Sequence, residues 1–162
     1  MLNGPDFIRD MRRGEEDAVD ALLRAAFAGP DEAGLVRRLR KDRDMAGESV
    51  LTWQGEVIGY FALSRMRAPK TWLCLAPVAI HPDWQGKRHG QRMMGMLSEW
   101  ARISGRYVVV LGQVAFYERG GFSQARAARL TTPYPVENTL LAGPGADAPG
   151  VTLKYPRAFD GL

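Results

Sequence analysis

The stretch LAPVAIHPDWQGKRHG, residues 75–90, decides the fold. It begins as an apolar strand, continues as a polar turn that contains a glycine, and leads into an amphipathic helix from about Arg88 to Ser104. Backbone N–H groups at the start of a helix have no partner inside the helix, and the helix dipole makes them an anion site. Gly86 and Gly90 leave room for a phosphate to approach the backbone. This stretch therefore predicts a phosphate-binding turn.

Basic side chains surround the same turn. Lys87, Arg88 and His89 supply positive charge or hydrogen-bond donors at its rim. The pattern lacks the GxxxxGK[ST] of a nucleotide P-loop and the GxGxxG of a dinucleotide fold. The chemistry of these residues alone therefore leaves two interpretations open, a phosphate site and a solvated basic turn.

Pro77 lies inside the apolar strand predicted over Thr71–Ile80. Proline has no N–H and cannot donate to a ladder in a central strand, so Pro77 indicates a bulge or a place where two strands part. An edge strand without a ligand is the alternative. The order strand, turn, helix, strand from Thr71 to Gly112 predicts two parallel neighbours in the sheet.

The remaining patterns predict a single α/β domain over residues 1–162, with a mixed sheet covered by helices on both faces. Two helices are expected near the N-terminus, one from about Glu15 and one over Asp31–Lys41. Further strands are expected at Phe7–Met11, Ser49–Trp53, Glu56–Met66, Tyr107–Gly112 and within residues 150–156.

Composition excludes several classes of protein. Hydrophobic residues make up 46% and charged residues 25% of the 162 residues, as in ordinary globular proteins. The net charge of +4 is scattered, as on an ordinary solvated surface; it also suits a polyanionic cofactor, and no Lys/Arg block is long enough to indicate nucleic acid. Cys74 is the only cysteine, so no intramolecular disulfide forms. No apolar run approaches the roughly 18 residues of a membrane span, and no leader is recognisable, so we expect a cytoplasmic protein that binds no membrane.

The segment HPDWQGKRHGQRMM resembles the acetyl-CoA signature of the GNAT superfamily, [QR]-x-x-G-x-[GA]. Gln85 takes the first position and Gly90 the last, and Arg88 stands where the middle glycine is expected. If this position needs a positive φ, the arginine is strained; otherwise it adds a phosphate contact. The likeness extends through VVVLG and FYERGGF to a Tyr-Pro-x-Ala-Phe segment, Tyr155–Phe159, that resembles the end of a bacterial GNAT subgroup.

This resemblance implies a GNAT-like, mostly antiparallel sheet of about seven strands, with a V-shaped splay between two parallel strands. It implies acetyl-CoA as co-substrate and no metal. The pantetheine arm is expected to enter the splay and bond the backbone of Val78 and Ile80. The pyrophosphate is expected to be wrapped by residues of the turn: Gln85, Gly86, Lys87, Arg88, His89 and Gly90.

Tyr117 is the candidate catalytic residue, because AFYERGGF resembles the GNAT segment in which a tyrosine precedes x-x-x-G-F. A lysine-like amine with a pKa near 10.4 must lose a proton to attack, and a thiolate whose acid has a pKa near 8.5 must gain one. A tyrosine hydroxyl can supply that proton or stabilise the anion. A core aromatic is the alternative. The base stays open among Glu32, His81, Glu137 and a water chain.

The resemblance predicts an N-acetyltransferase that passes acetyl from acetyl-CoA to a primary amine by direct attack in a ternary complex. The alternative is a non-catalytic, acyl-CoA-binding regulatory module. Cys74 lies between leucines in an apolar strand, which favours a buried small hydrophobe over a covalent acetyl carrier. A monomer or a homodimer is expected.

Overall fold

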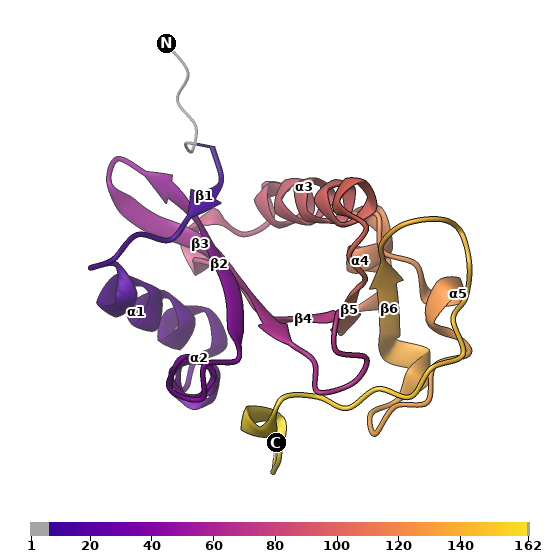
Figure 1. Ribbon diagram of the computed structural model, residues 1–162. Helices are drawn as coiled ribbons and strands as arrows, with labels where there is room; N and C mark the ends of the chain where they lie inside the picture. Colours follow the sequence, from indigo (N-terminus) through magenta and orange to yellow (C-terminus); the bar gives the residue numbers. More distant parts are fainter. Residues whose placement is uncertain (1–6, 162) are drawn as a thin grey trace.

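The computed structural model describes residues 7–161. Its six-stranded sheet follows the chain, in the order β1-β2-β3-β4-β5-β6 (Figure 1). Neighbouring strands are antiparallel except for β4 and β5, which are parallel as predicted. The strands are β1 (Arg9–Asp10), β2 (Met45–Trp53), β3 (Glu56–Arg65), β4 (Leu73–Ile80), β5 (Val108–Leu111) and β6 (Thr139–Ala142).

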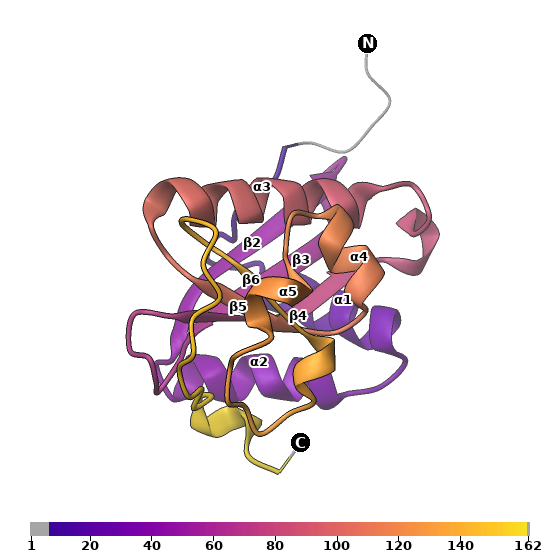
Figure 2. The ribbon, with the colours of Figure 1, turned by 90° about the vertical axis from the view of Figure 1, so that its right-hand side faces the viewer.

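Helices cover both faces of the sheet. Helices α3 and α4 lie on one face, and α1, α2 and the C-terminal segment lie on the other (Figures 1 and 2). The α-helices are α1 (Glu16–Phe27), α2 (Asp31–Lys41), α3 (His89–Ser104), α4 (Val114–Arg119) and α5 (Gln124–Ala127). Three 3₁₀ turns complete the structure, η1 (Pro82–Trp84), η2 (Val136–Asn138) and η3 (Arg157–Phe159).

The core divides into layers because side chains alternate along each strand. On β4, Leu73 and Leu75 pack toward α3 with Met93, whereas Cys74 packs on the opposite face with the C-terminal segment. A third cluster joins α1 and α2 to β2 and β3. Fully burying one such large apolar side chain stabilises the fold by about 1.5–3 kcal/mol.

A β-bulge in β4 confirms what Pro77 indicates. Leu63 pairs with Leu75, and Phe61 pairs with Val78. An advance of three residues along β4 therefore matches an advance of only two residues along β3. The one extra residue falls between Leu75 and Val78, where Pro77 lies. The parallel pairing of β4 with β5 also ends at Leu75. The two strands therefore part at the proline, and the far half of β4 continues without a β5 neighbour.

Two predictions about strands are wrong. The sheet has six strands, not about seven. Residues 150–156 form no strand; they make isolated bridges, Thr131 to Thr152 and Ala68 to Lys154, because they pair with loops beyond the sheet. The sixth strand, β6, is instead the buried run TLLA, whose four residues are too short for a periodicity to show. Helix α5 is also absent from the prediction.

Other boundaries shift only slightly. The strand predicted at Phe7–Met11 is reduced to two residues, and β2 begins four residues before Ser49. Helix α2 has the predicted bounds. No helix within residues 7–161 is long and apolar enough to cross a membrane. Residues 1–6 lie outside the described part, and the expectation about the start of the sequence is not tested there.

Candidate functional site

A pocket of about 780 Å³ opens where β4 loses its β5 neighbour. Its walls are the end of β4, the turn before α3, the start of α3, and α4. Every predicted site residue except Lys87 lines it: Val78, Ile80, Gln85, Gly86, Arg88, His89, Gly90 and Tyr117. Residues that lie 39 positions apart in the sequence, Val78 and Tyr117, thus share one cavity.

The free edge of β4 faces this pocket. The N–H of His81 donates to the carbonyl of Ile58 on β3 at 2.8 Å. Because successive residues of a strand point their backbone groups to alternate sides, those of Val78 and Ile80 point away from β3, into the gap left by β5. The Ile80 carbonyl accepts from the Gln85 side-chain amide at 2.9 Å. The other backbone N–H and C=O groups of Val78 and Ile80 form a free strand edge. An extended ligand can bond to this edge in the way that an added β-strand would.

The turn before α3 presents free amides. Within the described residues, the N–H groups of residues 86–90 donate to no protein acceptor. Helix α3 has no side-chain cap that would satisfy them. Five amides beside the positive end of a 16-residue helix dipole form an anion site. Gln85 differs from this group, because its N–H already donates weakly to the Pro82 carbonyl at 3.4 Å.

Arg88 adopts the conformation that favours glycine. Its φ is 65° and its ψ 16°, in the left-handed region, and Gly86 has a φ of 76°. The position therefore needs a positive φ, and an arginine there is strained by about 1–2 kcal/mol. Arg88 lines the pocket and lies next to the free amides despite that strain.

Two glycines allow aromatic rings to approach the backbone. A Cβ on Gly90 would lie 3.0 Å from the Phe116 ring, and one on Gly112 would lie 2.6 Å from the Tyr117 ring. The two rings also meet edge to face, with centroids 4.9 Å apart. Phe116 and Tyr117 therefore form a fixed aromatic wall against α3 and the end of β5.

The Tyr117 hydroxyl makes no hydrogen bond to another described residue, although the side chain is partly buried against the core. Burial, and to a smaller extent the Cys74 thiol, raise the pKa of Tyr117 to about 12. Tyr117 therefore keeps its proton at neutral pH and presents it as a hydrogen-bond donor. Burial also raises the pKa of Cys74 to about 12, so the thiol stays protonated and behaves as a small hydrophobe.

The basic rim is built around Trp84. The Lys87 ammonium lies 5.1 Å from the Trp84 ring centroid, and the His89 ring lies 5.6 Å from it. Burial, and then Arg92 and Lys87, lower the pKa of His89. His89 is therefore neutral at pH 7, and Lys87 supplies charge at the rim without lining the pocket.

The candidate bases lie outside the pocket lining. The His81 ring accepts from the Asp83 N–H at 3.1 Å and caps the turn η1, and Glu32 lies in the first turn of α2. Glu137 belongs to η2. No aspartate or glutamate is among the described residues that line the pocket. No group of three His, Cys, Asp or Glu side chains within residues 7–161 could hold a metal ion.

Sequence reasoning missed six lining residues: Phe27, Trp84, Gln91, Gly112, Gln113 and Arg119. Arg119 and Gln113 flank the segment that contains Tyr117, so their closeness to Tyr117 in the sequence could have indicated that they belong to the site. Phe27 comes from the end of α1, and nothing local in the sequence places it beside β4.

Comparison with known proteins agrees with this geometry. Residues 46–124 match the model of the acetyltransferase (GNAT) domain. The uncharacterised N-acetyltransferase YhbS of Escherichia coli K12 is 33% identical over 125 residues, which cover 72% of this chain and 73% of that protein.

Two solved structures are similar over nearly the whole chain. The crystal structure of YhbS from Escherichia coli in complex with CoA has a TM-score of 0.85 and 28% identity, and the match covers 95% of this chain and 91% of that one. A GNAT family acetyltransferase from Brucella melitensis in complex with acetyl-CoA has a TM-score of 0.79 and 26% identity, covering 98% and 100%. Sequence, fold and pocket agree, and the chain belongs to the GNAT superfamily of N-acetyltransferases.

Proposed function

We propose that the protein binds acetyl-CoA in the pocket beside β4 and transfers the acetyl group to a primary amine while both reactants are bound. One observation carries this proposal. The amides of residues 86–90 are unpaired within the described chain and lie beside an open strand edge. A diphosphate fits the first feature and the amide-containing pantetheine arm fits the second. The CoA and acetyl-CoA in two similar structures support the choice of ligand.

The rim charges fit the same ligand. Arg88 and Arg119 line the pocket, and Lys87 lies over Trp84 beside it. Cations here favour a ligand with several phosphate charges and raise its rate of encounter. With the diphosphate at the turn and pantetheine along Val78 and Ile80, the thioester would lie near Tyr117.

Tyr117 would act on the leaving sulfur. The amine nitrogen bonds to the thioester carbonyl carbon and gives up its extra proton to water, the C–S bond breaks, and sulfur departs with the electron pair. A proton moved from Tyr117, with its pKa of about 12, to a thiolate whose acid has a pKa near 8.5 would climb by about 5 kcal/mol. Donation of a hydrogen bond to the thiolate is therefore the better role, and the thiolate takes its proton from solvent.

The amine would lose its proton before attack. No carboxylate is among the described lining residues, so water is the expected acceptor of that proton. Only about 0.1% of a lysine-like amine is unprotonated near pH 7.4. The logarithm of kcat/KM should therefore rise with a slope of about one per pH unit up to the pKa of the amine. A plateau several units lower would reveal a base on the enzyme.

Release of free thiol tests the function directly. Acetyl-CoA is incubated with the protein and a panel of amines, and thiol release is compared with acetylated product. Equal amounts of the two are expected for at least one amine. Tight binding of acetyl-CoA without product from any amine would favour the non-catalytic binding module instead. ATP serves as a control ligand, because its triphosphate lacks the pantetheine arm and should bind far more weakly.

A further inference from the structure

Leu111 lies where the gap between β4 and β5 begins. The last pair of the two parallel strands is Leu75 with Val110, so Leu111 is the first residue of β5 beyond the pairing. Side chains alternate along β5: Val108 and Val110 pack toward α3, whereas Val109 packs on the opposite face. The Leu111 side chain therefore points to the same face as Val109, the face on which α1, α2 and the C-terminal segment lie (Figure 1).

Leu111 is exposed although β5 is an inner strand of the sheet. This strand lies between β4 and β6, and its other three residues are buried, yet Leu111 is 40% exposed. A large apolar side chain on an inner strand is usually covered by the layer that packs on the sheet. The described chain leaves this one partly uncovered, so the face opposite α3 is accessible beside the gap.

Phe27 reaches the same gap from α1. It is the last residue of α1, it is 41% exposed, and it lines the pocket that also contains Val78 and Tyr117. Helix α1 packs on the face opposite α3, in the core cluster that includes Ala79 of β4. The pocket thus has walls from both sides of the sheet, from α3 and α4 on one side and from α1 on the other (Figures 1 and 2).

The two sides of this pocket differ in chemistry. The free amides of residues 86–90, Arg88 and the Tyr117 hydroxyl belong to the turn before α3 and to α4, where the proposed function places the cofactor. The side formed by α1 contributes Phe27 and no charged residue to the described lining. If acetyl-CoA occupies the polar side, the amine has the α1 side from which to approach the thioester.

The α1 side is suited to an apolar ligand. Phe27 and Leu111 are two of the six large apolar side chains that are exposed within residues 7–161. An apolar ligand placed against them would remove both surfaces from water, which is favourable. No aspartate or glutamate is among the described lining residues, so a second cationic group on the acceptor would find no carboxylate in the pocket.

We propose that the acceptor is a primary amine on an apolar alkyl or aryl body, and that Phe27 and Leu111 contact this body from the face opposite α3. Both are then specificity-determining residues. The inference rests on the proposed function, which it deepens by naming the class of substrate. A diamine is the competing class, because Glu137 lies two residues before Thr139, the partner of Leu111.

Three amines with the same number of non-hydrogen atoms test the class. Pentylamine, 4-aminobutan-1-ol and 1,4-diaminobutane differ only in the group that ends the chain, a methyl, a hydroxyl or an ammonium. With saturating acetyl-CoA, thiol release should give pentylamine a kcat/KM at least about tenfold above that of the other two. From butylamine to hexylamine, each added methylene should raise kcat/KM by about fourfold. Equal values for the three amines, or a preference for the diamine, overturn the inference.

Phe27→Ala tests the contact from α1. The KM for pentylamine should rise about tenfold and the preference over 4-aminobutan-1-ol should shrink, while the Kd for acetyl-CoA stays unchanged. The matched control is Ile103→Ala, which removes an exposed apolar side chain of α3 outside the pocket and should change none of these values. A weaker affinity for acetyl-CoA with an unchanged preference among amines would assign Phe27 to the cofactor and overturn its part in acceptor recognition.

Leu111→Asn tests the contact from β5. The preference for pentylamine over 4-aminobutan-1-ol should fall by about threefold to tenfold. This ratio compares two substrates of one protein, so a lower melting temperature of the variant does not change it. An unchanged ratio would show that Leu111 does not touch the acceptor.

The inference and the proposed function fail in different ways. Acetylation of the three amines with equal kcat/KM would overturn the inference and leave the transfer function intact. If no amine is acetylated, calorimetry on the CoA-saturated protein decides between the two. Tighter binding of pentylamine than of 4-aminobutan-1-ol would then retain the apolar site and overturn the transfer function, whereas no difference in binding would overturn both.

Discussion

At the scale of single residues, the Tyr117 hydroxyl is a hydrogen-bond donor that no described residue uses. Its ring rests on Gly112 and against Phe116, and its hydroxyl has no partner among the described residues. Buried donors that have no structural partner are those that a developing anion can use without reorganisation. The pKa of about 12 keeps this donor protonated through the physiological range.

Tyr117→Phe should lower kcat by about 10²-fold and leave the affinity for acetyl-CoA nearly unchanged. The reason is that the lost hydrogen bond forms only as the thiolate develops. Steady-state kinetics and calorimetry measure the two quantities. In the wild type, deprotonation of Tyr117 should cause no loss of kcat below about pH 11, because its raised pKa lies above that value.

The matched control is Tyr107→Phe, which removes a hydroxyl that donates to Asp147 outside the pocket. Its kcat should match that of the wild type. An unchanged kcat in Tyr117→Phe, measured with a good amine substrate, would remove Tyr117 from the proposed chemistry.

Arg88→Gly tests whether the strained arginine contributes through its side chain. Glycine relieves the cost of a positive φ but adds freedom to the unfolded chain, so the free energy of unfolding should change by less than about 1 kcal/mol. Affinity for acetyl-CoA should fall by about threefold to tenfold if the guanidinium contacts a phosphate. Urea denaturation and calorimetry give the two values.

Arg43→Gly serves as the control, because Arg43 has a φ of 61° and does not line the pocket. It should show the same change in stability with no change in affinity. Tighter binding of acetyl-CoA by Arg88→Gly would mean that the arginine only obstructs the site.

At the scale of elements, the bulge in β4 connects the fold to the pocket. One proline inserts an extra residue, the pairing with β5 ends, and the freed edge becomes one wall of the cavity. The turn before α3 forms a second wall of the cavity. Helix α4, which carries Tyr117, forms a third wall. The position of α4 depends on close approach at Gly112, whose N–H donates to the Asn138 carbonyl at 3.0 Å.

Gly112→Ala should therefore reduce kcat by about tenfold, because the new methyl group would lie 2.6 Å from the Tyr117 ring and displace it. Far-UV circular dichroism should remain that of the wild type. The control is Gly95→Ala in α3, where a Cβ meets nothing within 4 Å; it should stabilise the protein by up to about 1 kcal/mol and leave kcat unchanged. Full activity of Gly112→Ala would show that the ring position does not matter.

Sequence reasoning succeeded where the signal is local. Helix α2 has its predicted bounds because its apolar residues recur at helical spacing, and the turn before α3 lies where glycines beside a helix start predict it. Prediction from the sequence failed for segments whose conformation or position depends on tertiary contacts. Residues 150–156 have the alternating composition of a strand but pair with loops, and Phe27 reaches the pocket only because α1 packs beside β4. The left-handed conformation of Arg88 also needed the structure.

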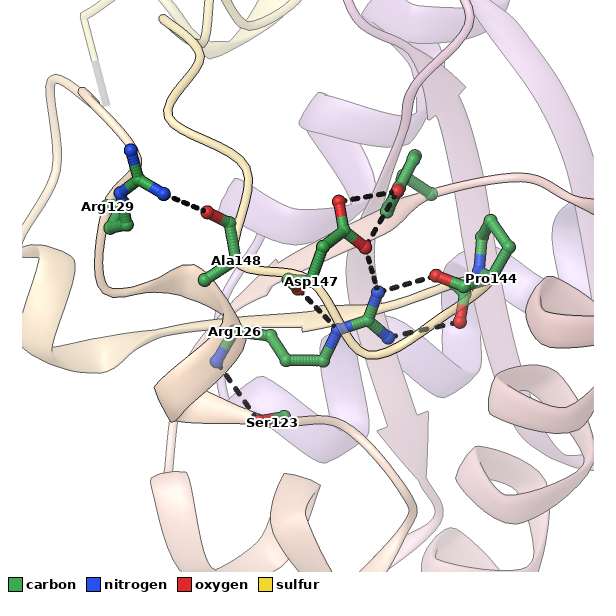
Figure 3. Close-up of polar contacts among 8 residues, drawn as sticks. Ser123, Arg126, Arg129, Pro144, Asp147 and Ala148 are labelled. Carbon is green, nitrogen blue, oxygen red and sulfur yellow. Dashed lines mark hydrogen bonds and ion pairs between the residues drawn. The ribbon is translucent and has the colours of Figure 1, made fainter.

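At the scale of the whole molecule, one arginine anchors the loop that follows β6 (Figure 3). The Arg126 guanidinium of α5 donates to the carbonyls of Gly143, Pro144 and Asp147, at 3.1, 2.6 and 2.9 Å, and pairs with the Asp147 carboxylate. Tyr107 donates to the same carboxylate. This network fixes the loop after β6, from which the C-terminal segment continues to Tyr155.

Arg126→Gln should lower the free energy of unfolding by about 2–3 kcal/mol, because several hydrogen bonds to a charged group are lost at once. Affinity for acetyl-CoA should be unchanged, since Arg126 does not line the pocket. Arg129→Gln, which removes a single bond of 3.3 Å to the Ala148 carbonyl, is the control and should cost less than about 1 kcal/mol. Equal losses in the two variants would contradict the anchoring role.

The central claim is that the turn before α3 and the free edge of β4 together bind acetyl-CoA. A crystal structure of the protein with coenzyme A tests it most directly. We expect diphosphate oxygens within about 3.2 Å of the amides of residues 86–90, and pantetheine amides bonded to the backbone of Val78 or Ile80. Coenzyme A bound elsewhere, with the amides of residues 86–90 paired to protein carbonyls, would contradict it.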